Sequence, residues 1–330
     1  MRGMRKRLSA LFAVARSTLL EGLQQPVTLL LALTCFELTA LQPLVHLHTF
    51  GEPGRLTRDC GMACLLVFGV AVAAFTAGFT LAAEIRDGTA ATALAKPVPR
   101  PVFLLGKFLG SCAVAAVFAW GQTWGTLLAV RTAEAYVETA HRVGLVRDGL
   151  CGGLSAALPA AALAVAALAN AISRRRFALW YFGALSLLAP ALSLGLGLVG
   201  REGTWLGAGA WAWASDARIV PLALLLFALL CVFCALATAF STRLPTGPAL
   251  ALSFLLLFLG FLTDGDAFSG PAGACVRALV PDVQDFWLAD ALADGGRILP
   301  AQAARVGLYA AGYVVFVLSL GLLSFRNKDL

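Results

Sequence analysis

The chain has 330 residues, of which 60% are hydrophobic and only 13% are charged, and its mean hydropathy is +0.84. So few charged side chains cannot cover a soluble protein of this length, which excludes ordinary soluble, disordered and disulfide-framework secreted proteins. The net charge of +7 indicates basic residues held at one face of a membrane, and a nucleic-acid partner is not needed to explain it.

The first 25 residues predict an amphipathic helix lying at the membrane surface. Apolar residues recur at helical spacing over 8–23, with Arg16 and Glu21 between them. A cleavable signal peptide is the alternative, because basic residues precede an apolar stretch and the triplet Ala13-Val14-Ala15. The spacing favours a retained interfacial helix over 1–25, followed by a membrane domain that starts at Pro26, where the missing N–H costs nothing.

Apolar runs of about 20 residues, the length that crosses the hydrocarbon core as a helix, predict an all-α polytopic bundle. The eight predicted spans lie near 26–46, 60–83, 108–130, 150–172, 177–199, 219–240, 247–263 and 304–325. An even number of spans places both termini on one side. Fifteen of the 25 Lys and Arg residues then fall on that side, mostly in short loops, so the positive-inside rule predicts cytoplasmic termini and a multi-pass protein of the cell (inner) membrane.

The segments 167–174 and 235–242 have similar sequences, and each closes a span before a basic turn. A duplicated hairpin added to a six-span plan is therefore an alternative to eight independent spans, although Ala- and Leu-rich helices also resemble one another by composition alone. In either plan, residues 26–330 form one membrane domain, with a cytoplasmic segment at 84–107 and a long outer loop at 264–303.

The sequence contains no catalytic or metal-binding pattern. Cys231 and Cys234 have CxxC spacing, but no His or carboxylate is adjacent, and the eight scattered cysteines are interpreted as packing residues. A phosphate loop, a His-Glu-x-x-His pair and a Gly-x-Ser-x-Gly turn are all missing. We therefore expect that the chain is not an enzyme and that it binds no cofactor, metal or nucleic acid of its own.

The connection between the second and third spans carries most of the functional information. Glu84, Arg86 and Asp87 place charges at the end of one helix, and three prolines within 97–101 exclude helix and stiffen the turn that follows. Apolar residues 103–105 then offer side chains that can lie on an apolar surface. A stiff turn would pass a push on to both spans, which favours a docking site for a moving partner, with a solvated basic loop as the alternative.

Three groups of residues in this connection resemble the coupling segment of ABC-2 type permeases, the membrane subunits of ABC exporters that include the copper-enzyme-maturation and gliding-associated branches. They are Glu84-x-x-x-Gly88-Thr89, Lys96-Pro97-Val98-x-Arg100 and Leu105-Gly106-Lys107-x-x-Gly110. The N-terminal helix resembles the family's elbow helix, and the turn at 240–243 and the region 280–326 resemble its later parts. Residues 131–218 depart from the family pattern.

This resemblance implies a membrane-spanning exporter subunit that converts ATP hydrolysis by a separate ABC ATPase into substrate translocation. The ATPase would hold ATP and Mg and dock beneath the segment 84–107, and two permease copies, identical or paralogous, would face each other in the lipid bilayer. Docking or coupling roles are implied for Glu84, Arg86, Asp87, Gly88, Thr89, Lys96, Pro97, Arg100, Gly106 and Lys107.

Within that set the implied roles are mechanical. Glu84, Gly88 and Thr89 would shape the helix tip that meets the ATPase, whereas Pro97 and Arg100 would hold the turn. Gly106 and Lys107 would set the point where the chain returns to the lipid headgroups. For Lys107 the alternative is ordinary snorkelling of a lysine at a helix start.

Glu37 lies about midway along the first predicted span, where an ionised carboxylate is costly unless it is paired, protonated or facing water. It is therefore a candidate for a substrate path, and a protonated or hydrogen-bonded structural carboxyl is the alternative.

The sequence also leaves two competing functions open. One is an ATP-independent secondary transporter that uses Glu37 as a proton-coupled group, and the other is a membrane scaffold that recruits partners through a basic inner face.

Overall fold

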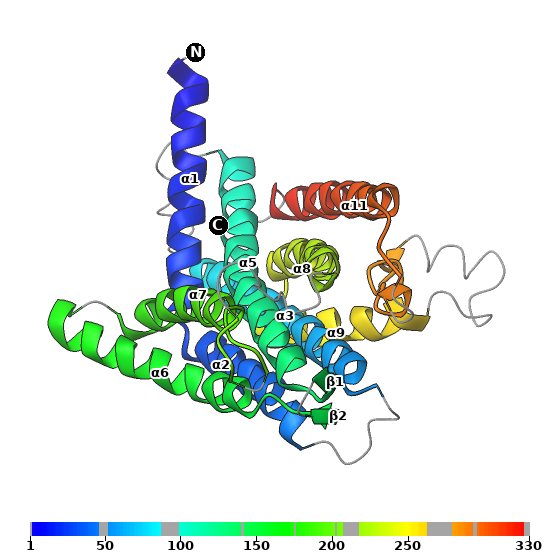
Figure 1. Cartoon of the computed structure of the whole chain (residues 1–330). Helices are drawn as coiled ribbons and strands as arrows, with labels where there is room; N and C mark the ends of the chain where they lie inside the picture. The colour runs from blue at the N-terminus through cyan, green and yellow to red at the C-terminus, as the bar shows by residue number, and fades with distance from the viewer. Residues whose placement is uncertain are drawn as a thin grey trace. The chain divides into compact units, whose positions relative to one another are not determined.

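The computed structural model describes residues 2–45, 52–86, 99–139, 142–174, 176–201, 203–206, 218–262, 279–292 and 296–326. Within these ranges the chain is mostly helical (Figure 1). Its α-helices are α1 (Arg2–Leu23), α2 (Pro26–Leu41), α3 (Pro53–Arg86), α5 (Arg100–Thr132), α6 (Gly149–Ser173), α7 (Phe177–Leu196), α8 (Ile219–Ser241), α9 (Thr246–Leu262) and α11 (Pro300–Arg326). Short 3₁₀ turns at Gln42–Leu44 and Asp290–Leu292 complete the helical part.

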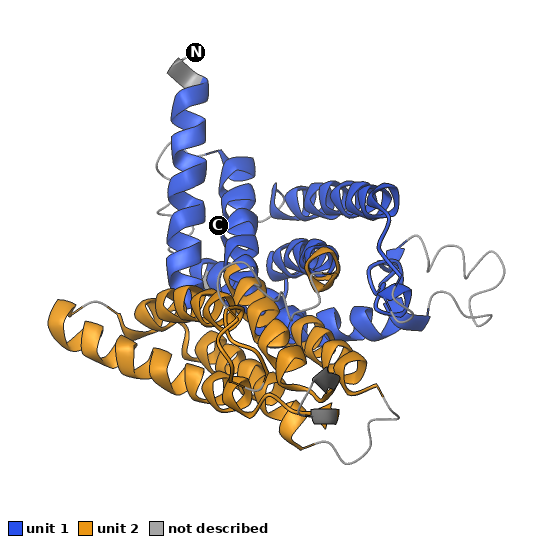
Figure 2. Ribbon diagram, viewed as in Figure 1, with its two compact units in different colours: residues 1–23, 69–116, 224–330 blue, residues 24–68, 117–223 orange. Residues whose placement is uncertain are grey.

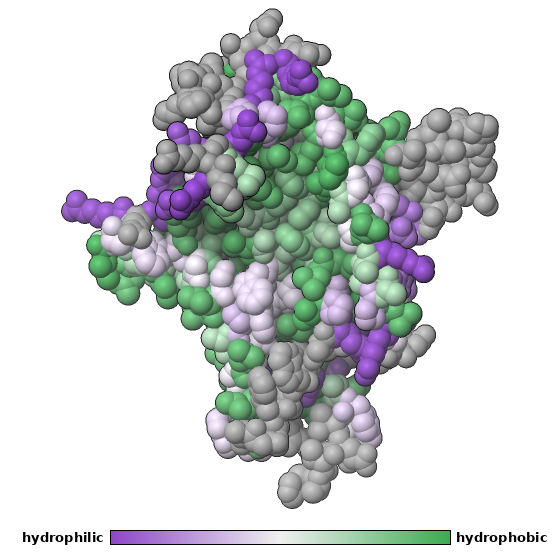
Figure 3. Space-filling view, turned by 90° about the horizontal axis from the view of Figure 1, so that it is seen from above, coloured by the Kyte–Doolittle hydropathy of each residue, from purple (hydrophilic) through white to green (hydrophobic). Residues whose placement is uncertain are grey.

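Seven of the described helices are long and apolar enough to cross a membrane: α2 with its 3₁₀ extension, α3, α5, α6, α7, α8 and α11. The eighth predicted span, 247–263, is the apolar helix α9, which has only 17 residues. On the face drawn in Figure 3, hydrophobic residues form a broad area with hydrophilic residues gathered toward its edges. The chain is therefore an integral membrane protein.

Local sequence explains where these helices begin. Pro26 occupies the first turn of α2, where its missing N–H would have had no partner, and Pro53 and Pro300 open α3 and α11 in the same way. At the start of α6, the side chain of Asp148 accepts a hydrogen bond of 2.9 Å from the backbone N–H of Cys151, as an N-cap does. The helix beginnings are thus set by short-range rules that the sequence displays.

The described residues divide into two compact units, which Figure 2 colours separately. Unit 1 comprises residues 1–23, 69–116 and 224–330, and unit 2 comprises 24–68 and 117–223. The long helices α3 and α5 contribute one part to each unit, as does α8 near its first turn.

Unit 2 contains a feature that the sequence did not predict, a β-hairpin between the predicted spans 108–130 and 150–172. Strands β1 (Ala135–Thr139) and β2 (Arg142–Val146) pair antiparallel, with Ala135 opposite Val146. The prediction of an all-α chain is correct for the helices and wrong at this hairpin. Tyr136, Val137 and Thr139 favour extended backbone, but five residues on each strand are too few to produce a clear alternating pattern.

A buried ion pair joins the end of α5 to the start of α6, the two helices that flank the hairpin in the sequence. Arg131 Nε donates to Asp148 Oδ2 at 2.9 Å, and Arg131 also donates to the carbonyl of Val199 at 2.6 Å. Both side chains of the pair are almost fully buried. Because Asp148 also caps α6, one carboxylate satisfies two groups that would otherwise be buried without partners.

Unit 1 is built around an apolar cluster near the C-terminal end of α3 and the start of α5. Leu81, Phe103, Leu104 and Phe325 are all buried in it, and the rings of Phe103 and Phe325 stack with centroids 6.1 Å apart. Two of the three apolar residues at 103–105 thus pack inside the chain, and only Leu105 is exposed. Where α3 approaches α8, the cluster consists of Ala74, Ala77 and Ala237, whose small side chains let the helices lie close together.

We expect Asp148→Ala to lower the free energy of unfolding by about 3–5 kcal/mol, because it leaves the buried Arg131 guanidinium without its carboxylate and removes a helix cap. The matched control is Glu134→Ala, which removes the partly exposed ion pair with Arg147 (3.1 Å) and should cost about 1 kcal/mol or less. Thermal or denaturant unfolding of the detergent-solubilised protein measures both. Equal losses would contradict a structural role for the Arg131–Asp148 pair.

Candidate functional site

The structure describes five of the eleven candidate site residues with their side chains. Glu84, Arg100, Gly106 and Lys107 lie in unit 1, and Glu37 lies in unit 2. Arg86 is the last residue of α3. Asp87, Gly88, Thr89, Lys96 and Pro97 lie outside the described residues.

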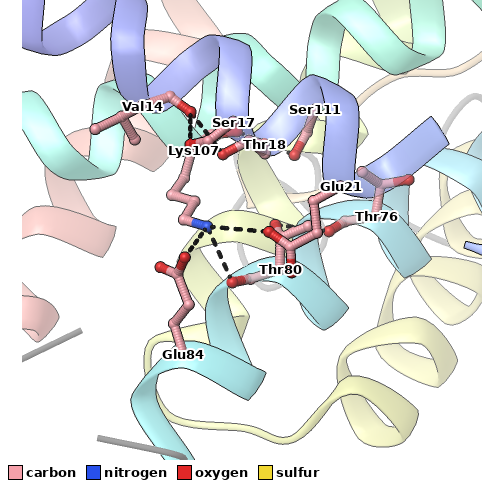
Figure 4. Close-up of polar contacts among 9 residues, drawn as sticks. All are labelled: Val14, Ser17, Thr18, Glu21, Thr76, Thr80, Glu84, Lys107 and Ser111. Atoms are coloured by element: carbon pink, nitrogen blue, oxygen red, sulfur yellow. Dashed lines mark hydrogen bonds and ion pairs between the residues drawn. The ribbon is translucent and has the colours of Figure 1, made fainter. Parts of the chain in front are cut away.

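Three residues meet around the ammonium of Lys107, and we refer to Glu21, Thr80, Glu84 and Lys107 as the Lys107 site (Figure 4). Lys107 Nζ lies 2.9 Å from Glu84 Oε1 and donates to the backbone carbonyl of Thr80 at 3.1 Å. The Glu21 carboxylate lies 3.8 Å from the same nitrogen. One side chain of α5 thereby contacts α3 twice and α1 once.

Helical spacing explains how these groups come to face one another. On α3, Thr80 and Glu84 are four residues apart and therefore lie on one face, so the carbonyl of the first and the carboxylate of the second point the same way. On α1, Val14, Thr18 and Glu21 follow the i, i+4, i+7 pattern, which places Glu21 on the face that packs inward.

The close approach of α1 to α5 depends on two glycines. A Cβ at Gly106 would lie 2.7 Å from side-chain atoms of Val14, and one at Gly110 would lie 2.7 Å from the carbonyl oxygen of Ala15. These are shorter than any normal contact, so a side chain at either glycine would push the helices apart. Glycines four residues apart form the small-residue face that lets membrane helices touch along their backbones. Gly106 is thus a packing point for the N-terminal helix.

The alternative reading of Lys107, a lysine snorkelling to the membrane surface, does not fit the structure. Its side chain is 2% exposed, so the ammonium is buried among helices and does not reach solvent along the helix surface. The nitrogen also lies 5.8 Å from the centroid of the Phe103 ring, within the range of a cation–π contact. A buried ammonium needs opposite charge and hydrogen-bond acceptors, and α1 and α3 supply both.

The Lys107 site carries more negative than positive charge, because two carboxylates share one ammonium. Burial raises the pKa of Glu21 above its ordinary value, the Lys107 ammonium opposes this shift, and the Glu84 carboxylate adds to it. The two carboxylate side chains remain 32% and 27% exposed, for Glu21 and Glu84 respectively, whereas the lysine does not. The glutamate side chains are therefore more exposed than the lysine, although the Oε2 atom of Glu84 is itself buried.

Glu84 was predicted to offer an exposed charge to a partner; its side chain is 27% exposed, and its Oε1 atom lies 2.9 Å from Lys107 Nζ. Sequence analysis missed Glu21 and Thr80. The signal for Glu21 was present, since it shares the inward face of α1 with Val14 and Thr18. Thr80 contributes its backbone carbonyl. Every residue has such a carbonyl, so the residue type at position 80 could not predict this role.

Arg100 begins α5, and its guanidinium donates to the carbonyl of Arg326 at 2.6 Å. Arg243, in the turn between α8 and α9, donates to the hydroxyl and the carbonyl of Ser324 at 3.0 and 2.9 Å. These bonds satisfy carbonyl groups at the end of α11, which have no partner within the helix. Arg100 therefore contacts the end of α11 in addition to its expected position next to the proline-rich turn.

Glu37 is half-buried on α2, and no basic side chain within the described residues forms an ion pair with it. In the same unit, the buried hydroxyl of Tyr181 on α7 has no hydrogen-bond partner in the described part of the chain. Glu37 belongs to unit 2, whereas the residues of the Lys107 site belong to unit 1.

The Lys107 site holds three helices together, because one ammonium contacts the Glu21 and Glu84 carboxylates and the Thr80 carbonyl. In the ranges that the structure describes, no group of three His, Cys, Asp or Glu residues could hold a metal ion. Searches of protein-family models and of curated proteins found no match to this chain.

Replacing Glu84 and replacing Lys107, the two partners of the 2.9 Å ion pair, should lower the free energy of unfolding by different amounts. We expect Glu84→Gln to destabilise the protein more than Lys107→Met, because the first change leaves an ammonium that is 2% exposed with the Glu21 carboxylate, 3.8 Å away, as its remaining opposite charge, whereas the second leaves carboxylate side chains that are 32% and 27% exposed. Unfolding of the two single variants and the double variant, analysed as a double-mutant cycle, measures the difference. A larger loss for Lys107→Met would contradict this description of the site.

The raised pKa of Glu21 predicts a pH dependence of defined sign. The folded state binds the Glu21 proton more tightly than the unfolded state, so folding stability gains as the pH falls from above the raised pKa toward the ordinary value. We therefore expect Glu21→Gln to be more stable than the wild type at neutral pH, with the difference disappearing in acid. Unfolding of both proteins between pH 7 and pH 4 checks this. A variant less stable at neutral pH would show that attraction to Lys107 outweighs burial.

Proposed function

We propose that this chain is the membrane-spanning permease subunit of an ABC-type exporter, which couples ATP hydrolysis by a separate ATPase to movement of a substrate across the membrane. The observation that carries the proposal is the buried Lys107, which connects α3, α5 and α1 on both sides of the segment 87–98. This is the same segment whose residues resemble the coupling segment of ABC-2 type permeases.

The contacts support a mechanical role. Glu84 lies two residues before the end of α3, and Lys107 lies within the first two turns of α5, so their ion pair links the two helices close to where the connection begins and ends. The stacked Phe103 and Phe325 rings add α11 to the same region. A force applied to residues 87–98 would therefore displace α1, α3, α5 and α11 together, because separating them means exposing a buried charge and an apolar cluster.

On this proposal the ATPase docks beneath the connection and holds ATP and Mg, while a second permease copy completes the transporter in the bilayer. The chain itself performs no catalysis. Both termini and the segment 84–107 lie in the cytoplasm, as the distribution of Lys and Arg predicts.

The test is site-specific cross-linking in native membranes. A photoreactive amino acid at Thr89, in the proposed docking segment, should cross-link to a polypeptide that contains an ATP-binding phosphate loop, and Gly88→Pro in the same protein should reduce the yield severalfold. The matched control carries the photoreactive group at Tyr136, which is exposed on β1 and lies on the predicted outer side. It should give no such product.

Two outcomes would reject the proposal. One is labelling of residue 89 only from the outside of the cell. The other is transport that survives loss of every ATPase partner but disappears in Glu37→Gln, which would instead identify a carboxyl-driven secondary transporter.

A further inference from the structure

An apolar groove of about 430 Å³ lies between α8, α9 and α11 in unit 1. Its walls are formed by Leu236 and Phe240 of α8, Leu252 and Leu256 of α9, and Phe316 and Leu320 of α11. Figure 1 shows α8 between the other two helices. The lining carries hydroxyl groups at Tyr313 and Ser324, and the Tyr313 hydroxyl is already bonded to the carbonyl of Leu279 at 2.6 Å.

The length of the groove matches one leaflet of a bilayer. The part of α11 from Tyr313 to Ser324 measures about 16 Å at a rise of about 1.5 Å per residue. Half of a hydrocarbon core that is about 30 Å thick is nearly the same length. A chain lying along α11 from Ser324 inward would therefore end near the middle of the membrane.

Positive charge gathers at the Ser324 end of this groove. Arg243 donates to Ser324, Arg100 donates to the carbonyl of Arg326, and Arg326 is itself exposed. A guanidinium has five N–H donors, and these bonds use two of them on Arg243 and one on Arg100. No carboxylate of the described residues forms an ion pair with any of these three arginines.

We propose that this groove binds an anionic phospholipid, with one acyl chain along α8, α9 and α11 and the phosphate at Arg100, Arg243 and Arg326. The acyl chain fits because it needs no hydrogen bonds, whereas an extended peptide would bury backbone groups that the lining cannot satisfy. The phosphate fits because guanidinium groups bind it with paired hydrogen bonds. A second copy of the chain would cover the apolar walls but would not account for three cations at one end. The site does not depend on the proposed transport function.

The test measures lipid retention by native mass spectrometry of the full-length protein in mild detergent, incubated with phosphatidylglycerol and phosphatidylcholine of equal chain length. Wild type should retain phosphatidylglycerol in preference to phosphatidylcholine. Arg243→Gln should reduce that retention about fivefold, the effect expected of one basic residue near an anionic headgroup. Leu320→Trp, which leaves every arginine in place and fills the groove, should reduce it as well. Arg305→Gln removes the same charge from the other end of α11 and should change nothing.

Three results would overturn the proposal. The first is equal retention of the two lipids, or unchanged retention in Leu320→Trp. The second is displacement of phosphatidylglycerol by an equal concentration of inorganic phosphate, which would indicate a site for a free anion. The third is a disulfide between two copies through Leu320→Cys in a dimer that carries no lipid, which would show that a second copy occupies the groove.

Discussion

An ammonium buried among membrane helices must be surrounded by opposite charge and hydrogen-bond acceptors, and in unit 1 this requirement falls on Lys107. Its partners come from two other helices, so α1 has to lie against α5 and α3 has to extend as far as Glu84. The small surface of Gly106 and Gly110 makes that approach sterically feasible. Burial, charge pairing and close packing therefore depend on one another, and the loss of any one would weaken the other two.

The few charges of this chain are concentrated where helices end. In unit 2, Arg131 and Asp148 join the end of α5 to the start of α6, and Asp148 caps the latter. In unit 1, Arg100 and Arg243 satisfy carbonyls in the last turn of α11. An apolar helix can cross hydrocarbon without help, but its terminal backbone groups cannot, and side chains with several donors or acceptors meet that need. The same arginines retain donors that can face a lipid phosphate.

The positions of several helices could be predicted from the lengths of apolar runs in the sequence. The limits of α6, α7, α8 and α9 lie within a few residues of the predicted spans, because apolar length and flanking polar residues determine them. Helices α3 and α5 begin earlier than the predicted spans. Their first turns contain charged residues, and a prediction based on hydropathy leaves such turns out of a span. Arg58 and Lys107 are such residues, and both are buried in the structure. The β-hairpin was missed because its two strands are too short to show a period.

The sequence by itself determined that the protein belongs in a membrane and, within a few residues, where α6, α7, α8 and α9 begin and end. Those properties depend on composition and on neighbours within a few positions. Only the tertiary structure decided that Lys107 is buried, that Glu21 and the Thr80 carbonyl are its partners, and that Arg100 and Arg243 contact the last turn of α11. The physical reason is that a charge in an apolar protein is defined by what surrounds it, and the groups around it come from helices that are distant in the sequence.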